Sequence, residues 1–75
     1  MNKARRRAIQ NLCVELDKIE ESLTSILEEE DDYRDNMPES FVESERYSDS
    51  EEASDALSSA IDSVAEAKDS LVNIL

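Results

Sequence analysis

The side chains of this chain that could do chemistry are mostly carboxylates. Twelve of its 20 acidic residues lie between Glu28 and Glu52, where Arg34 and Arg46 are the only bases, and five consecutive acids from Glu28 to Asp32 open the stretch. Paired carboxylates do acid and base work only inside a cleft that drives their pKa values apart, and a thin helical protein offers little cleft. We therefore expect a non-enzymatic protein with no catalytic residue.

Residue types also argue against a metal or a cofactor. Calcium loops need a Gly for their sharp turn, and transition-metal sites usually take His or several Cys, whereas this chain has no Gly, no His and one Cys. A weak divalent site made of carboxylates alone is the alternative. Cys13 has no His to activate it and is expected to be an ordinary packed or flanking thiol, and one Cys cannot form an internal disulfide.

The acidic stretch has two possible uses. Like charges one helical turn apart repel, and acids at the C-terminal end of a helix oppose its dipole, so this concentration of charge costs folding energy. The acids are either a solvated surface that keeps the protein soluble or a surface that binds a partner. On the second interpretation, the partner-binding residues are Glu28, Glu29, Asp31, Asp32, Asp35, Phe41 and Glu45.

The elements that must position these residues are two helices. From residue 9 onward apolar side chains alternate at spacings of three and four, which predicts a helix over 3–33 with Ile9, Leu12, Leu16, Ile19, Leu23 and Ile26 at the core positions of a heptad, continuing to Glu30, Tyr33 and Met37. The stretch 55–75 repeats in sevens, with Leu57, Val64 and Leu71 in one core column, Ala60, Ala67 and Ile74 in the other, and Asp55, Asp62 and Asp69 in a third. Ser48 and Glu51 form a capping-box pattern, so a second helix is expected over 49–75.

We expect one domain, 1–75, that is all-α: an antiparallel, coiled-coil-like two-helix hairpin. Its apolar stripes are wider than a two-helix seam needs, which favours pairing of two copies into a four-helix bundle. The residues expected to hold this homodimer are Leu16, Leu23, Leu27, Leu57, Ile61, Val64, Leu71 and Leu75. An isolated hairpin and a longer coiled coil are the alternatives.

The basic N-terminus tests this topology. Lys3, Arg5, Arg6 and Arg7 lie where positive charge opposes the dipole of the first helix. In an antiparallel hairpin they lie beside the negative C-terminal end of the second helix, which compensates them. A nucleic-acid patch is the alternative, but four basic residues without interleaved aromatics on a protein of net charge −12 are weak evidence for one. We expect no direct binding of nucleic acid.

A structured joint is expected over 34–48. Pro38 ends the first helix, because the residue before a proline is disfavoured in helical geometry, and Pro38 to Phe41 can form a short helical turn. The apolar residues of the region then form a plug that caps the bundle, or present an anchor to a partner: Tyr33, Met37, Phe41, Val42 and Tyr47. No apolar run reaches the ~18 residues that span a bilayer, and no signal peptide is recognised, so a cytoplasmic protein without membrane contact is expected.

The joint also carries a resemblance. Tyr33 to Glu39, Ser44 to Tyr47 and the following helix with Glu51, Glu52, Ala53 and its Ala-rich heptads resemble a group of small, acidic helical proteins encoded in phages and prophages of Gram-positive bacteria. The resemblance covers roughly 28–75. It implies phage origin, a helical hairpin and a place in the host cytoplasm, and it implies no settled activity.

Two classes of function follow. In the first, the acidic surface imitates the phosphates of nucleic acid and inhibits a host defence or nucleic-acid-processing protein by occupying its basic surface. In the second, the chain is a structural or assembly protein whose role is helical oligomerisation, and its acids provide solubility. Binding by mimicry should weaken steeply with salt, whereas assembly through Leu and Ile should not.

Overall fold

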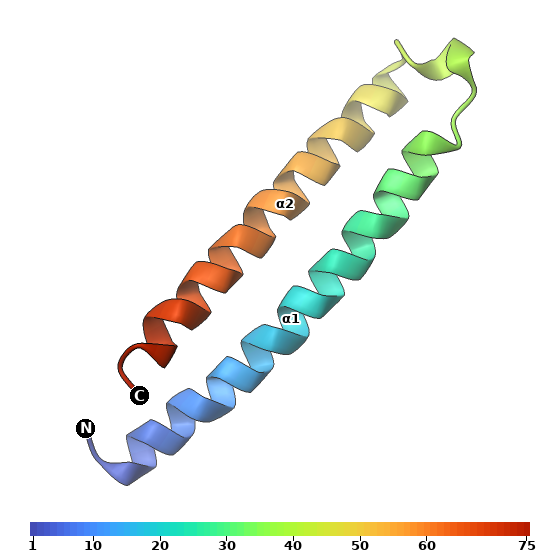
Figure 1. Cartoon of the computed structure of the whole chain (residues 1–75). Coiled ribbons are helices and arrows are strands. Elements are labelled where there is room, and N and C mark those ends of the chain that lie inside the picture. The colour runs from blue at the N-terminus through green and yellow to red at the C-terminus, as the bar shows by residue number, and fades with distance from the viewer.

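Two long helices lie side by side in a computed structural model that describes all 75 residues. Helix α1 (Lys3–Asp35) and helix α2 (Glu45–Val72) run antiparallel, and a short 3-10 helix, η1 (Glu39–Phe41), lies in the joint between them. The hairpin is a rod with Cα extents of 59 × 14 × 13 Å, with both termini at one end and the joint at the other (Figure 1). The all-α hairpin predicted from the heptads is confirmed.

Helix α1 begins and ends where local chemistry allows. The side-chain oxygen of Asn2 accepts a hydrogen bond of 2.8 Å from the backbone N–H of Arg5, which caps the first turn. The helix continues to Asp35, two residues beyond the predicted end. Met37 and Pro38 follow, and the proline ring disfavours helical geometry in the residue before it.

Helix α2 begins one turn earlier than predicted, so the expected start at Asp49 is wrong. Ser44 is the N-cap: its hydroxyl accepts a hydrogen bond of 3.2 Å from the N–H of Tyr47, and Ser48 lies inside the helix. The added turn has a physical reason, since it places Tyr47 against α1, where Tyr47 is half-buried. At the other end α2 stops at Val72 rather than at the chain terminus.

The seam between the helices follows a heptad. Its members are spaced alternately by three and four residues and are half-buried or buried: Ile9, Cys13, Leu16, Glu20, Leu23, Leu27, Glu30 and Arg34 on α1, and Tyr47, Ser50, Ser54, Leu57, Ile61, Val64, Lys68 and Leu71 on α2. One core column of each helix therefore lies where it was predicted, namely the column of Leu16 and Leu23 on α1 and that of Leu57, Val64 and Leu71 on α2.

The second predicted core column of each helix is wrong by one residue. Leu12, Ile19, Ile26 and Tyr33 are 49%, 48%, 50% and 45% exposed, and the column that follows them, Cys13, Glu20, Leu27 and Arg34, faces α2 instead. On α2, Ser54, Ile61 and Lys68 face inward, whereas Ala67 and Ile74 are exposed and Ala60 is half-buried at the edge. Polar pairing explains the rotation: Arg34 and Lys68 reach partners on the opposite helix only when their columns face the seam.

The hairpin buries very little of itself. Only Cys13, Ser50 and Ser54 are less than a tenth exposed, so of the two expected positions of Cys13, packed or flanking, the structure shows the packed one. Seven of the eight residues expected to hold a dimer lie in the seam within one chain, namely Leu16, Leu23, Leu27, Leu57, Ile61, Val64 and Leu71, while Leu75 lies past the end of α2. Neither helix has a segment both long and apolar enough to cross a membrane.

Candidate functional site on the acidic side of the hairpin

The two sides of the hairpin can be assigned from the seam. A helix turns by about 100° per residue, so the residue after an inward-facing one lies on one side of the hairpin and the residue before it lies on the other. The axes of α1 and α2 lie in one plane, and the two sides of the hairpin lie above and below it. A two-fold axis perpendicular to this plane exchanges two antiparallel helices, and this rotation does not exchange the two sides. Equivalent positions of α1 and α2 therefore share a side.

Carboxylates occupy most of one of the two columns of positions that follow the inward residues. On α1 these are Glu21, Glu28 and Asp35, and on α2 they are Asp55, Asp62 and Asp69, all of them exposed. We call these six residues the acidic side. Each row repeats every seven residues, so its carboxylates are spaced by about 10 Å along the rod. The two helices thus carry two parallel rows of negative charge.

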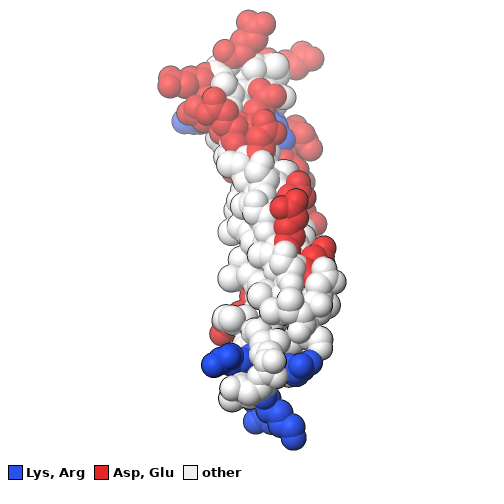
Figure 2. Space-filling view, turned by 90° about the vertical axis from the view of Figure 1, so that its left-hand side faces the viewer, with Lys and Arg blue, Asp and Glu red and all other residues white.

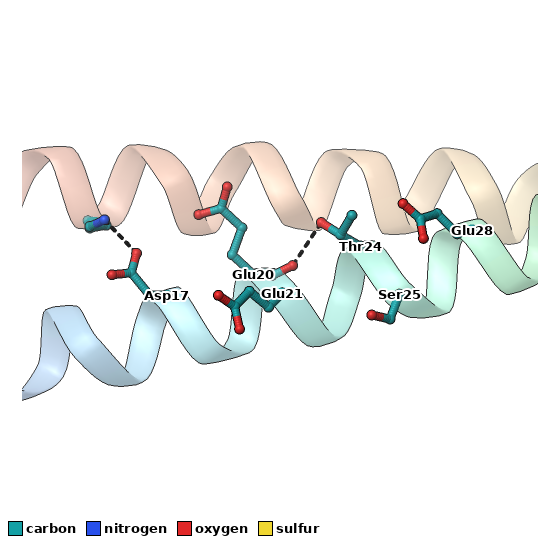
Figure 3. A pocket seen from close by; sticks show the side chains of 7 residues that line it. Asp17, Glu20, Glu21, Thr24, Ser25 and Glu28 are labelled. Carbon is teal, nitrogen blue, oxygen red and sulfur yellow. Dashed lines mark hydrogen bonds and ion pairs between the residues drawn. The ribbon is translucent and has the colours of Figure 1, made fainter.

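A shallow groove runs along this side where α1 faces Lys68 of α2. Its lining contains no apolar residue and consists of Asp17, Glu20, Glu21, Thr24, Ser25, Glu28 and Lys68 (Figure 3). Lys68 is paired with Asp17, with Nζ 2.5 Å from Oδ1, and this hydrogen bond raises the pKa of Lys68. The Thr24 hydroxyl donates to the carbonyl oxygen of Glu20 at 2.9 Å. With the cation engaged by Asp17, the groove stays negative through Glu20, Glu21 and Glu28.

Asp31 is held in a polar cluster that ties the helices together near the joint. Arg34 donates through Nη1 to the hydroxyl of Ser54 at 2.7 Å and to the carbonyl of Ser50 at 3.1 Å, and through Nη2 to Asp31 at 2.8 Å. The Ser54 hydroxyl donates to the same Asp31 oxygen at 2.8 Å. The Ser54 hydrogen bond, followed by that of Arg34, lowers the pKa of Asp31, and the hydrogen bond to Asp31 raises the pKa of Arg34.

Charge is also separated along the rod. Basic side chains lie at the end that holds the termini, and acidic side chains gather at the joint end (Figure 2). The guanidinium of Arg6 donates through Nη1 to the carbonyl oxygen of Leu75 at 2.6 Å. The predicted compensation between the basic N-terminus and the end of the second helix is therefore confirmed for Arg6.

The seven predicted partner-binding residues do not form one surface. Glu28 and Asp35 lie on the acidic side, Asp32 lies on the outer surface of α1, and Glu29, which precedes the inward-facing Glu30, lies on the opposite side. Asp31 is engaged in the cluster with Arg34. Phe41, 44% exposed, ends η1, and Glu45 is the first residue of α2.

Sequence reasoning missed four members of the acidic side: Glu21, Asp55, Asp62 and Asp69. The recurrence of the three Asp residues every seven positions was visible, and Glu21 lies seven residues before Glu28. Their common side could not be read without knowing which columns face the seam. The seven-residue spacing of these acids was therefore the available signal, and the rotation of each helix about its own axis was the missing information.

The apolar residues of the joint do not close into a plug. Met37 and Tyr47 are half-buried, but Tyr33, Phe41 and Val42 are each about 45% exposed. The interpretation of these residues as an exposed anchor stays a prediction. No three side chains of acidic, His or Cys type converge in a way that could hold a metal ion.

Comparisons with protein-family models, with curated proteins and with solved structures found no match. The resemblance to phage-encoded helical proteins therefore stays a prediction.

Proposed function

We propose that this chain is a non-enzymatic, phage-type binding protein whose acidic side occupies a basic, nucleic-acid-binding surface of a host protein and thereby inhibits it. The observation that carries the proposal is the pair of carboxylate rows, three on each helix, along one side of a long hairpin. A host defence or nucleic-acid-processing enzyme is the kind of target that this charge pattern fits, in the cytoplasm of the infected cell.

The spacing of the rows supports imitation of a nucleic-acid backbone. Phosphates follow one another by about 3.4 Å of helix axis along a DNA strand, so carboxylates about 10 Å apart correspond to roughly every third phosphate. A groove that evolved to bind phosphates gains much of its affinity by neutralising negative charge, and carboxylates on a rigid helix supply such charge. The rows carry fewer charges than DNA, so we expect affinity to depend strongly on salt concentration.

The absence of ion pairs at the six carboxylates of the acidic side also supports the proposal. Each of the six carboxylates is exposed, and none takes part in an ion pair, whereas Asp17 and Asp31, at the edge of the seam, are paired with Lys68 and Arg34. Paired acids hold the helices together, and unpaired acids remain available to a partner. The acidic side is thus distinct from the residues that stabilise the fold.

The experiment compares two variants of equal net charge. The acidic-side variant neutralises five carboxylates, by Glu21→Gln, Glu28→Gln, Asp55→Asn, Asp62→Asn and Asp69→Asn. The control, called the outer-surface variant, neutralises five exposed carboxylates that all lie outside the acidic side, on the outer surface or on the opposite side, by Glu15→Gln, Glu29→Gln, Asp32→Asn, Glu52→Gln and Glu66→Gln. Proteins retained from host lysate by the wild-type chain and displaced by duplex DNA are identified, and the affinity of each variant for them is measured across a salt series.

The acidic-side variant should lose at least tenfold in affinity, and its log K against log salt slope should flatten by about one unit for each lost contact, as in DNA complexes. The outer-surface variant should keep the wild-type affinity and slope to within a small factor. Equal losses in both variants would show that net charge alone matters, and the absence of any DNA-displaceable partner would contradict mimicry.

The second candidate is a structural or assembly protein. It is favoured by a different observation, namely the column Leu12, Ile19, Ile26 and Tyr33, which remains about half exposed along the whole of α1. On this interpretation the carboxylates provide solubility, and association should persist or tighten as salt is raised, because burial of apolar surface does not depend on charge.

A further inference from the structure

The side of the hairpin opposite the acidic side carries a column of apolar residues. Of the two columns that precede the inward-facing residues, one holds Glu15, Glu29 and Asp49 together with Ser22 and Ser63, and the other is apolar. The apolar column is formed by Leu12, Ile19, Ile26 and Tyr33 on α1 and by Ala53, Ala60 and Ala67 on α2, and Ile74 continues it just past the end of α2. We call these eight residues the apolar side. Tyr33 and Ala53 line one surface depression near the joint, which agrees with their placement on a common side, and the rest of its lining is polar or charged.

The size of this side matches a stable protein interface. The rod measures 59 Å by 14 Å between outermost Cα atoms, so one side offers roughly 800 Å², which is about what each partner contributes to a standard interface. The hairpin also needs such a contact, because Cys13 is its one buried apolar residue and small domains that bury little surface are marginally stable alone.

We propose that the apolar side is covered by a second copy of this chain, with the two rods reversed end to end, in a four-helix bundle whose two-fold axis crosses the middle of the apolar side. Helix α1 then packs on α1 of the partner subunit, and α2 on α2. The large residues of α1 meet each other, and the small Ala residues of α2 let the two α2 helices approach closely.

The apolar columns of the two helices are centred at nearly the same height along the rod, as a single two-fold axis of the dimer requires. Asp17 pairs with Lys68, and Asp31 with Ser54, so the point between Ser22 and Leu23 on α1 faces the point between Asp62 and Ser63 on α2. The apolar column of α1 is centred between Ser22 and Leu23, and that of α2, with Ile74 just past its end included, is centred between Ser63 and Val64. These centres differ by one residue, or about 1.5 Å along the rod, so one axis serves both columns.

Charge selects the reversed arrangement. Rods aligned with their joints together would place two segments of net charge −10 beside each other, whereas reversed rods place the basic end of each copy beside the acidic joint of the other. Arg5 lies one heptad before Leu12, on the apolar side, and in the reversed arrangement it is at the level of the partner's acidic joint. Such complementary charges fix register and orientation.

This inference stands apart from the proposed function, because it concerns the opposite side of the rod. A dimer formed in this way leaves the rows of Glu21, Glu28 and Asp35 and of the three Asp residues open to solvent. Neutralising the acidic side tests the function and leaves the dimer in place, whereas changing the apolar side tests the dimer. Failure of one is therefore distinguishable from failure of the other.

Disulfide cross-linking tests the arrangement directly. In a Cys13→Ala background, Ser22→Cys and Ser63→Cys each place one thiol near the proposed axis, and Ser25→Cys places one on the groove side as a control. After oxidation in dilute solution, Ser22→Cys and Ser63→Cys should each form dimers with themselves, and Ser25→Cys should remain monomeric on a non-reducing gel. A mixture of the first two that yields mainly mixed disulfides would overturn the reversed arrangement, because α1 would then pack on α2 of the partner subunit.

Sedimentation equilibrium tests whether the apolar side forms the dimer interface. The wild-type chain should have twice the 8.5 kDa mass of one chain. Ile19→Glu on the apolar side should raise the dimer dissociation constant at least tenfold, whereas Val14→Glu, equally exposed but on the other side of the seam, should leave it within about twofold. A wild-type chain that stays monomeric at millimolar concentration, or equal effects of the two substitutions, would overturn the proposal. If Ile19→Glu unfolds the chain, the cross-linking of the Ser22→Cys and Ser63→Cys variants tests the proposal in its place.

Discussion

Arg34 and Ser54 join the two helices: Nη1 of Arg34 donates to the Ser54 hydroxyl at 2.7 Å, although the residues are 20 positions apart in the chain. The side chain of Arg34 is 17% exposed, and Ser50 and Ser54 are 3% and 8% exposed. A planar guanidinium can serve several acceptors at once in fixed directions, which the compact ammonium of Lys cannot do. The least exposed part of this hairpin is therefore polar.

Arg34→Lys should destabilise the hairpin although it keeps the charge. One ammonium cannot reach Asp31, Ser54 and the Ser50 carbonyl in the geometry that Arg34 uses, so buried oxygens lose their donor. We expect the melting temperature, followed by circular dichroism, to fall by about 5 °C or more. Arg46→Lys, at an exposed position without a hydrogen-bonded partner in the hairpin, is the matched control and should melt like the wild type. Equal melting of the two variants would contradict a stabilising role for the cluster.

The pH dependence of stability should carry the signature of Asp31. Its pKa in the folded state lies below the ordinary value of 3.8, because Ser54 and Arg34 donate hydrogen bonds to the carboxylate. A lowered folded-state pKa contributes stability that is fully present above pH 3.8 and is lost as the pH falls through the lower folded value. The difference in melting temperature between the wild type and Asp31→Asn should therefore be constant near neutral pH and shrink in acid.

The reference for this measurement is Asp62→Asn, which removes one exposed carboxylate and changes the net charge equally. Melting curves of the three proteins between pH 7 and pH 2 give the comparison. A gap between wild type and Asp31→Asn that widens in acid would have the wrong sign and would rule out the described interactions of Asp31.

The start of α2 can be located by paired substitutions. Ser44→Ala removes the hydroxyl that accepts from the N–H of Tyr47 and should cost about 1 kcal/mol of unfolding free energy. Ser48→Ala changes a residue inside the helix and should be neutral or slightly stabilising, because Ala is the better helix former. Chemical denaturation of both variants measures the two effects. A larger loss of stability from Ser48→Ala than from Ser44→Ala would indicate instead that Ser48 is the N-cap and that the helix begins at Asp49.

Charge reversal at the basic end should affect the dimer selectively. Arg5→Glu places a negative charge on the apolar side, where the acidic joint of the partner subunit is expected, and should weaken dimerisation by roughly tenfold at low salt. Arg7→Glu makes the same change in net charge at a position on the acidic side of the seam and should weaken it much less. Sedimentation of both variants at low and high salt checks this, since screening should reduce the difference between them. Equal weakening would point to net charge instead of a specific contact.

Several features of the hairpin follow from local sequence. Two segments with heptad spacing and a proline between them predict two helices and a reversal, because the period of apolar residues must match the helical turn for a stripe to form. The column of Leu16 and Leu23 and that of Leu57, Val64 and Leu71 were placed correctly for the same reason, since each lies at the centre of its stripe. The contact between Arg6 and the end of the chain followed from helix-end electrostatics.

The rotation of each helix about its own axis was decided by tertiary structure alone. Each stripe is three columns wide, so turning α1 toward the column of Leu12 or toward that of Cys13 keeps Leu16 and Leu23 in the seam, and local periodicity does not distinguish the two. Pairs between distant residues do: Arg34 with Ser54 and Lys68 with Asp17 form in only one of the rotations. That choice leaves Ile19 and Ile26 exposed and aligns Glu21 and Glu28 with the Asp column of α2. The acidic and apolar sides therefore exist because long-range polar contacts, which no local pattern encodes, outweighed the burial of a more apolar column.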